Sequence, residues 1–339
     1  MVVPAAGLMN AADQSALFLV SEAMSYTYAA ALRAAAVLGV ADHLADDARD
    51  ADTLAEATGC DAAGLRRVLR LLVARGIVSP DGPDRFRLTA AGSALRRDVP
   101  GSVREAILML TDDMFWRTSH VVGDTLRTRS PSFEAVFGST VDDYFGSDPA
   151  KAALFYAGME AVSAAENRLI ARACELPGSG TVADIGGRYG GFLHAVLDAN
   201  PSLRGILFDR PDEVVKHQPL RGRVEVVAGD FFESVPPADV YLLKRIIHNW
   251  DDDQSVRILS TCRRSLRPGG RVLVIDAFVP PGDEPHDSKA MDFMMLGALS
   301  GRERTAAELE PLVTRAGLRL SHVVPTGTPL SVAVTEATE

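Results

Sequence analysis

One histidine and two acids stand at positions where they can do acid–base chemistry. His248 follows the apolar run 240–244, and an imidazole that titrates near neutrality can act as a general base. Asp276 ends the next predicted strand, and Glu303 precedes a predicted helix in GRERT at 301–305. A carboxylate that accepts the far ring N–H of a histidine fixes its tautomer and raises its basicity. The alternatives are a structural histidine and a glutamate that only helps to cap the helix.

Three further strand ends carry groups suited to a nucleoside. The first predicted strand runs into DIGGRYGG at 184–191, whose glycines let a ligand approach the backbone closely. The second ends at Asp209, where a carboxylate can accept hydrogen bonds from both hydroxyls of a ribose. The third ends in GDFF at 229–232, so Asp230 can accept from an exocyclic amine and Phe231 can lie against a purine. Either acid alone could be a cap or turn residue, but the three ends in succession predict a nucleoside site without a phosphate cradle.

The elements that would position these groups begin near residue 180. Apolar runs alternate with amphipathic stretches, which predicts a parallel sheet with strands at 182–185, 205–208, 224–227, 240–244 and 271–277. Two final runs across a Pro-Thr-Gly-Thr-Pro turn predict an antiparallel hairpin at 322–324 and 331–334. Open α/β sheets bind ligands at the carboxyl ends of their strands, so the candidate groups are expected at one edge.

The sequence pattern of the N-terminal third predicts a winged helix. A short helix capped by Asp52 and a second helix capped by Asp61 precede a hairpin at 77–88. The second helix carries three arginines that raise a DNA-reading hypothesis, Arg66, Arg67 and Arg70. The net charge of −10 favours instead a solvated face or pairing with acids of a partner subunit, and it opposes binding to nucleic acid or anionic lipid.

Length and composition set the broad class. A chain of 339 residues, 47% hydrophobic and 24% charged, is typical of a soluble protein with two domains. The most apolar early stretch, 29–40, contains Arg33 and is too short to span a membrane. The three cysteines form no CxxC pair, which fits the reducing cytoplasm. Helices predicted within 14–46 carry an apolar stripe wide enough to be either core or subunit contact.

Nearly the whole chain resembles one family, the small-molecule O-methyltransferases that include plant caffeate and flavonoid enzymes and bacterial antibiotic-tailoring enzymes. The motifs that carry the resemblance are DIGGxxGG at 184–191, FDRP at 208–211, GDFF at 229–232, LKRIIHNWDD at 243–252 and GRERT at 301–305. The resemblance implies an α/β fold, with a Rossmann-like catalytic domain that binds S-adenosylmethionine and an all-α, winged-helix domain that forms a homodimer. The corresponding boundaries are 1–102 for dimerisation, 103–175 for a helical linker and substrate-pocket region, and 176–339 for catalysis.

The resemblance also implies a role for each site residue. The cofactor contacts would be Asp184, Gly186, Asp209, Asp230, Phe231 and Lys244. The general base would be His248, flanked by Asp276 and Glu303. The acceptor would be bordered by Met159, Met291, Asp292 and Met295, which could equally be ordinary helix core. The implied reaction is in-line methyl transfer to a phenolic hydroxyl of a small aromatic natural-product intermediate, whose identity depends on pocket shape rather than on any motif.

Two positions depart from the family pattern, with Arg188 replacing a glycine and Asn249 replacing an aspartate. A non-glycine residue at a positive φ costs roughly 1–2 kcal/mol, which corresponds to about a tenfold loss of cofactor affinity. Without the usual His-Asp pair an iron or zinc site is unfavourable, and we predict no metal. Arg188 keeps open a rival in which the same fold supports hydroxylation or decarboxylation. A second rival is a winged-helix transcription regulator, which the acidic charge opposes.

Overall fold

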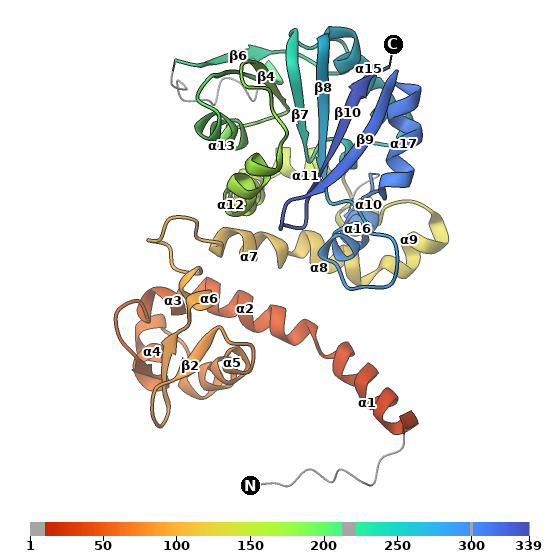
Figure 1. Cartoon of the computed structure of the whole chain (residues 1–339). Coiled ribbons are helices and arrows are strands. Elements are labelled where there is room, and N and C mark those ends of the chain that lie inside the picture. Colours follow the sequence, from red (N-terminus) through yellow and green to blue (C-terminus); the bar gives the residue numbers. More distant parts are fainter. Residues whose placement is uncertain (1–10, 212–221, 299–300, 339) are drawn as a thin grey trace. The chain divides into compact units, whose positions relative to one another are not determined.

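The structure is a computed structural model that describes residues 11–211, 222–298 and 301–338 (Figure 1). The contacts within the chain divide it into two compact units. The first unit comprises Met1–Asp112 and Ala153–Ala161, and the second comprises Asp113–Ala152 and Val162–Glu339. Among the described residues, no helix combines the length and the apolar character needed to cross a membrane.

The first unit consists of short helices and a small sheet. Its elements in chain order are α1 (Ala11–Ala23), α2 (Tyr26–Leu38), α3 (Val40–His43), β1 (Arg49–Asp50), α4 (Ala51–Thr58), α5 (Ala62–Ala74), β2 (Val78–Pro80), β3 (Arg85–Leu88), α6 (Ala90–Ser93) and α7 (Arg104–Leu110). The strands pair antiparallel in the order β1-β3-β2. Helical spacing places Leu65, Leu69 and Leu72 on one buried face of α5. The predicted winged helix is confirmed.

The helix caps of this unit agree with the sequence in one case and differ in another. Asp61 caps α5 as predicted, because its side chain accepts a hydrogen bond from the Gly64 N–H at 2.5 Å. The cap of α4 is Asp50, which accepts from the Thr53 N–H at 2.7 Å, so the prediction of Asp52 was wrong. Asp52 lies in the first turn of α4, where an acid is also favourable because it faces the positive end of the helix dipole.

The second unit contains the large sheet. Its helices before the sheet are α8 (Asp113–His120), α9 (Val122–Thr128), α10 (Phe133–Phe137), α11 (Val141–Ser147) and the long α12 (Pro149–Ala173), of which Ala153–Ala161 belongs to the first unit. The remaining elements are β4 (Gly180–Ile185), α13 (Gly191–Ala199), β5 (Leu203–Asp209), β6 (Val224–Ala228), β7 (Ala238–Lys244), η1 (Ile247–Asn249), α15 (Asp252–Ser265), β8 (Leu266–Asp276), α16 (Asp287–Ala298), α17 (Ala306–Arg315), β9 (Leu318–Pro325) and β10 (Ser331–Ala337).

The described strands of this unit form one seven-stranded sheet in the order β6-β5-β4-β7-β8-β10-β9. The strands from β6 to β8 pair in parallel, and β10 pairs antiparallel with both β8 and β9. The winding changes direction between β4 and β7, which are neighbours with Asp184 opposite Leu242. Ligands of open α/β sheets bind at such a switch point. The predicted parallel sheet and its antiparallel hairpin are confirmed.

Helices cover both faces of the sheet because successive strand residues point to opposite sides. Ala183, Ile185 and Tyr241 face the layer that includes buried residues of α15 and α17. Val182 and Leu242 face the opposite layer, which includes buried residues of α12 and α13. Figure 1 shows α17 beside β9, with α12 and α13 on the other side of the sheet. The central strands are buried between these layers, and they hold the strand ends that carry the candidate site.

Candidate active site

His248 lies in η1, the single turn that follows β7. Its Nδ1 atom lies 2.8 Å from Oε1 of Glu303, and the two side chains are only 10% and 1% exposed. An ionised carboxylate can only accept, so Nδ1 carries the proton and Nε2 of the neutral ring is an acceptor. Burial works to lower the pKa of His248, but the hydrogen bond to Glu303 and the charges of Asp276 and Glu303 outweigh it and raise the pKa above its usual value. The ring is therefore a strengthened base held in one tautomer.

Asp276 completes the predicted acid–base group at the end of β8. It is buried, and its Oδ1 atom has no hydrogen-bond partner among the described residues. Burial raises the pKa of Asp276 to about 6, although the charge of His248 acts in the opposite direction. Oε2 of Glu303 is likewise buried and lacks a partner within the described part of the chain. The structure thus brings His248, Asp276 and Glu303 together, with Glu303 bonded to the ring.

The glycine-rich turn after β4 holds three residues in the left-handed region, with φ of +70° at Gly186, +49° at Arg188 and +74° at Gly190. A Cβ atom at Gly186 would lie 2.6 Å from Cδ1 of Ile246, so a larger residue would need that side chain to shift and would also be strained by the positive φ. Arg188 carries a side chain at a positive φ that suits glycine. The backbone strain expected where Arg188 replaces the glycine of the family pattern is therefore present in the structure.

Asp184 is the last residue but one of β4, directly before this turn. A Cβ atom at Gly187 would lie 2.6 Å from Oδ2 of Asp184, so the turn packs directly on the carboxyl group. Oδ2 has no partner among the described residues. Burial raises the pKa of Asp184 to about 7, even though the charge of Lys244 works to lower it. A buried carboxyl with an unused oxygen fits a ligand that brings a hydrogen-bond donor to the turn.

Asp209 joins the same turn to the end of β5. Its Oδ2 atom accepts from the Arg188 N–H and its Oδ1 atom from the Arg210 N–H, both at 2.8 Å. The two carboxylate oxygens offer about four acceptor sites, so the two backbone bonds leave capacity for the hydroxyls of a ribose. Asp209 is therefore both a structural tie and a candidate ligand group.

The segment after β6 places an aromatic ring beside the turn. Asp230 is exposed, and its Oδ1 atom accepts from the Phe232 N–H at 2.8 Å, which is the turn role given above as the alternative. The ring of Phe231 packs on Trp250 with centroids 5.9 Å apart. An atom of that ring would lie 4.0 Å from a Cβ atom at Gly186. Phe231 thus borders the glycine turn, as expected of a group that lies against a base.

Lys244, at the end of β7, makes a buried contact that the sequence did not predict. Its Nζ atom lies 3.0 Å from Oε1 of Glu166 on α12, and Arg245 contacts the same carboxylate at 3.1 Å. Burial lowers the pKa of Lys244, and the charge of Glu166 acts against this. The sequence indicated the burial of Glu166 but not its partner, because Glu166 shares a helical face with the buried Ile170, four residues later.

The predicted acceptor-binding residues are only partly gathered. Oδ1 of Asp292 accepts from the Glu303 N–H at 3.0 Å, so this side chain supports the acid–base group directly. Met291 and Met295 are partly buried on the same helix, α16, and Met291 packs against the sheet. Met159 lies in Ala153–Ala161, the stretch of α12 that packs in the first unit. Asp292 is thus the one of the four with a direct bond to the acid–base group among the described contacts.

Comparison with known proteins identifies the chain. The family model of the O-methyltransferase domain matches residues 119–319, and that of the O-methyltransferase dimerisation domain matches residues 21–98. The chain belongs to the O-methyltransferase family. The predicted family, fold class and class of enzyme are confirmed by these matches and by the solved structures that resemble this methyltransferase.

Three relatives illustrate the similarity. The methyltransferase is 36% identical over 308 residues to the mitomycin biosynthesis 6-O-methyltransferase of Streptomyces lavendulae, with 88% of each chain covered. The crystal structure of CalO1, a methyltransferase in calicheamicin biosynthesis, in its SAH-bound form matches with a TM-score of 0.92 and 55% identity, covering 97% of this chain and 100% of that one. NcsB1, an O-methyltransferase from neocarzinostatin biosynthesis in complex with S-adenosylmethionine and 2-hydroxy-5-methyl naphthoic acid, matches with a TM-score of 0.70 and 34% identity, covering 91% and 95%.

Proposed function

We propose that this enzyme methylates a phenolic hydroxyl of a small aromatic natural-product intermediate, with S-adenosylmethionine as methyl donor and His248 as general base. The observation that carries the proposal is the buried contact of 2.8 Å between His248 and Glu303. A phenol has a pKa of about 10, so a base is needed to form the phenolate at neutral pH. A ring nitrogen whose basicity is raised by a buried carboxylate suits that task.

The cofactor is held at the carboxyl ends of β4, β5 and β6. When bound, S-adenosylmethionine supplies an electrophilic methyl group. The positive φ of Gly186 shapes the turn, the unused oxygen of Asp184 accepts from the cofactor, and the remaining capacity of Asp209 accepts from the ribose. The further contacts in this proposal are Asp230, Phe231 and Lys244. The likeness to CalO1 in its SAH-bound form supports this assignment.

The chain's own residues move one proton. Nε2 of His248 accepts the proton of the acceptor hydroxyl while Nδ1–H stays bonded to Glu303. The charges of Glu303 and Asp276 stabilise the imidazolium that results. Burial of all three side chains excludes water, so this charge stabilisation is stronger than it would be in solvent.

The acceptor is proposed to be aromatic and to lie against α16. NcsB1 was crystallised with 2-hydroxy-5-methyl naphthoic acid, an aromatic compound of the proposed class. Met291, Asp292 and Met295 on α16 are the proposed acceptor-binding residues. Met159, which the resemblance also implied, lies in the first unit. Methionine suits such a surface because its thioether packs favourably against aromatic rings.

The enzyme is proposed to act as a homodimer in the cytoplasm. Helix α1 exposes a continuous apolar run in which Leu17 is 56%, Phe18 61% and Leu19 66% exposed. Exposed apolar patches mark interaction sites, and the match to a dimerisation domain points to a second copy as the partner. Light scattering should show a monomer for Phe18→Glu, and a dimeric Phe18→Glu would contradict this assignment. The cysteines are free thiols, as expected in a reducing compartment.

His248→Gln tests the function with methyl-labelled cofactor and a hydroxynaphthoate acceptor. We expect kcat to fall by about 10²–10⁴-fold, because base catalysis contributes that much. The matched control is His322→Gln, since His322 also lies 3.0 Å from a glutamate, Glu175, but in an exposed pair. Full methyl transfer by His248→Gln at neutral pH would disprove the base assignment. Label that never reaches the product would favour hydroxylation or decarboxylation instead.

A further inference from the structure

Arg304 is a buried arginine that contacts both ends of the turn carrying His248. Its side chain is only 3% exposed. Nη1 donates to the carbonyl of Ile247 at 3.1 Å, and Nη2 donates to the carbonyl of Trp250 at 2.9 Å. Nε and Nη2 also donate to Oδ1 of Asp252 at 3.1 and 2.7 Å. One guanidinium therefore joins the residue before His248, the end of its turn and the start of α15.

The loop that carries Arg304 touches the same turn in two further ways. Glu303 binds the His248 ring, as described above. A Cβ atom at Gly301 would overlap the carbonyl oxygen of His248, so the two backbones are in direct contact and only glycine fits. The carbonyl of Arg304 itself accepts from the Val279 N–H at 3.0 Å, which ties the loop to the segment after β8.

The turn has little support of its own. Its own bonds are two backbone bonds, from the Asn249 N–H to Ile246 at 3.1 Å and from the Trp250 N–H to Ile247 at 3.2 Å, and one side-chain bond, from Nδ2 of Asn249 to the carbonyl of Arg245 at 2.9 Å. Single turns of this tight type have poorer hydrogen-bond geometry than an α-helix. The orientation of His248 thus depends on contacts from outside the turn. A guanidinium is suited to provide them, because its five donors lie in one rigid plane.

We propose that Arg304 is a positioning residue, which keeps the imidazole of His248 aligned with Glu303 by holding the carbonyls of Ile247 and Trp250. Glu303 and Arg304 are consecutive, so a shift of this loop alters the ring contact and the carbonyl contacts together. A lysine at this position keeps the positive charge but cannot reproduce a planar set of donors. The catalytic meaning of this role rests on the proposed function, whereas the positioning itself does not.

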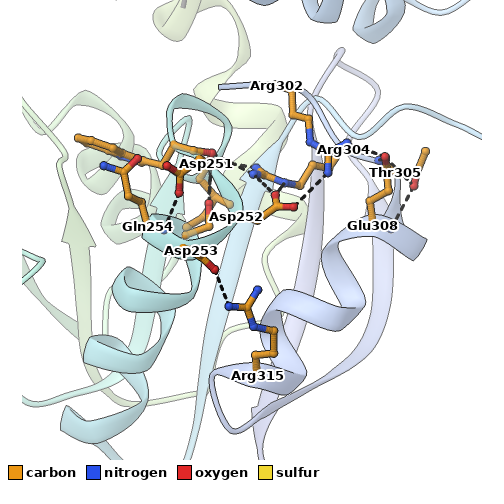
Figure 2. Close-up of polar contacts among 12 residues, drawn as sticks. Asp251, Asp252, Asp253, Gln254, Arg302, Arg304, Thr305, Glu308 and Arg315 are labelled. Carbon is orange, nitrogen blue, oxygen red and sulfur yellow. Dashed lines mark hydrogen bonds and ion pairs between the residues drawn. The ribbon is translucent and has the colours of Figure 1, made fainter. Parts of the chain in front are cut away.

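The neighbouring Arg302 provides a matched control. It is 45% exposed and pairs with Oδ2 of Asp252 at 3.4 Å and with Glu308 at 2.7 Å. Both arginines therefore share an acid, and Figure 2 shows them reaching it from the same loop. Of the two arginines, Arg304 is the one with described bonds to the carbonyls of the His248 turn. Oγ of Ser255 lies farther from the same two carbonyl oxygens, at 3.4 Å from each.

The test compares Arg304→Lys, Arg304→Met and Arg302→Met in the full chain. We expect Arg304→Lys to lower kcat about 10–100-fold, which is typical when a residue that supports a functional histidine is lost. KM for S-adenosylmethionine should change less than about threefold. NMR of protein carrying ¹³C-labelled histidine, assigned with His248→Gln, should show a lower pKa for His248, because a loosened Glu303 contact no longer counteracts burial. Arg302→Met should match the wild type within about twofold.

Wild-type kcat and an unchanged His248 pKa in Arg304→Lys would overturn the proposal. A loss of activity without any change in the histidine pKa or in the pH profile would also overturn it, because it would indicate a merely structural role. If Arg304→Met fails to unfold cooperatively, Arg304→Lys alone decides. If His248→Gln is fully active while the His248 pKa still falls in Arg304→Lys, the proposed function fails and the positioning role stands.

Discussion

Oε1 of Glu303 lies 2.8 Å from Nδ1 of His248, although the two residues are 55 positions apart in the chain. The contact assigns different tasks to the two ring nitrogens, since Nδ1 is occupied and Nε2 is left to accept a proton. It also explains how a buried histidine keeps a raised pKa, because burial alone would act in the opposite direction.

Glu303→Gln should lower kcat by about 10–100-fold, which is typical for the loss of a carboxylate that supports a functional histidine. Glutamine keeps an acceptor oxygen but removes the charge that raises the pKa of His248. The base must be neutral to act, so a lower pKa extends the active form toward acid. The acidic limb of the kcat/KM profile should therefore move to lower pH.

The matched control for this change is Glu308→Gln in the adjacent helix α17. Glu308 caps that helix through Thr305 and pairs with Arg302. None of its described bonds reaches the His248 ring or the turn that carries His248. Glutamine keeps the capping contact and loses only the exposed pair with Arg302, so stability should fall by less than about 1 kcal/mol and the pH profile should stay unchanged. An acidic limb that stays in place in Glu303→Gln would argue against the assigned role of Glu303.

Asp184→Asn should stabilise the enzyme in a pH-dependent way. Burial raises the pKa of Asp184 from 3.8 to about 7, so the folded protein binds a proton that the unfolded chain has released between these values. The wild type therefore loses stability as pH rises through this window, and the asparagine variant does not bear that loss. The difference in unfolding free energy should grow between about pH 4 and 7 and be constant above that range.

Denaturant unfolding at several pH values checks this expectation. Asp198→Asn on the exposed side of α13 is the control and should change stability by less than about 0.5 kcal/mol at each pH. A difference between Asp184→Asn and the wild type that shrinks as pH rises would contradict the raised pKa. The same variant should bind S-adenosylmethionine less tightly, because the unused oxygen of Asp184 is lost.

The strand ends could be predicted because they depend on local patterns. Alternating apolar runs located β4, β5 and β7, and the chemistry at their ends located Asp209 and His248. The parallel sheet then required these groups to share one edge. The local pattern predicted helix caps less well, because Asp50 rather than Asp52 caps the N-terminus of α4. Acids near a helix start are favourable at several adjacent positions, so sequence alone does not choose between them.

The contacts that could not be predicted are those made over long separations by charged side chains. Glu166 and Lys244 are 78 residues apart, and nothing in either segment specifies that they meet. Arg304 is similar, because an arginine in a polar loop is usually exposed and only tertiary packing buries this one at 3% exposure. Buried charges need partners, so each becomes explicable once the fold is known.

Arg188→Gly should raise the free energy of unfolding by about 1 kcal/mol. Arg188 has a φ of +49°, where a residue with a Cβ is strained by roughly 1–2 kcal/mol and glycine is not, although glycine also loses more entropy on folding. Arg188→Ala is the control, since it removes the side chain but keeps the strained Cβ, and it should give no gain. Equal stabilities for the two variants in urea would show that backbone strain is not the cause.

Glu166→Gln should destabilise the enzyme by about 3–5 kcal/mol, because it leaves the buried Lys244 and Arg245 without their shared counter-charge. Glu160→Gln on the exposed face of the same helix should cost less than about 0.5 kcal/mol. Adding Lys244→Met to Glu166→Gln removes one uncompensated cation, so the double variant should be more stable than the sum of the single effects predicts. A double-mutant cycle by urea unfolding measures this coupling, which should amount to about 0.5–3 kcal/mol. Strictly additive effects would mean that Glu166 and Lys244 have no coupling free energy, and that Glu166 stabilises the fold through its contact with Arg245 alone.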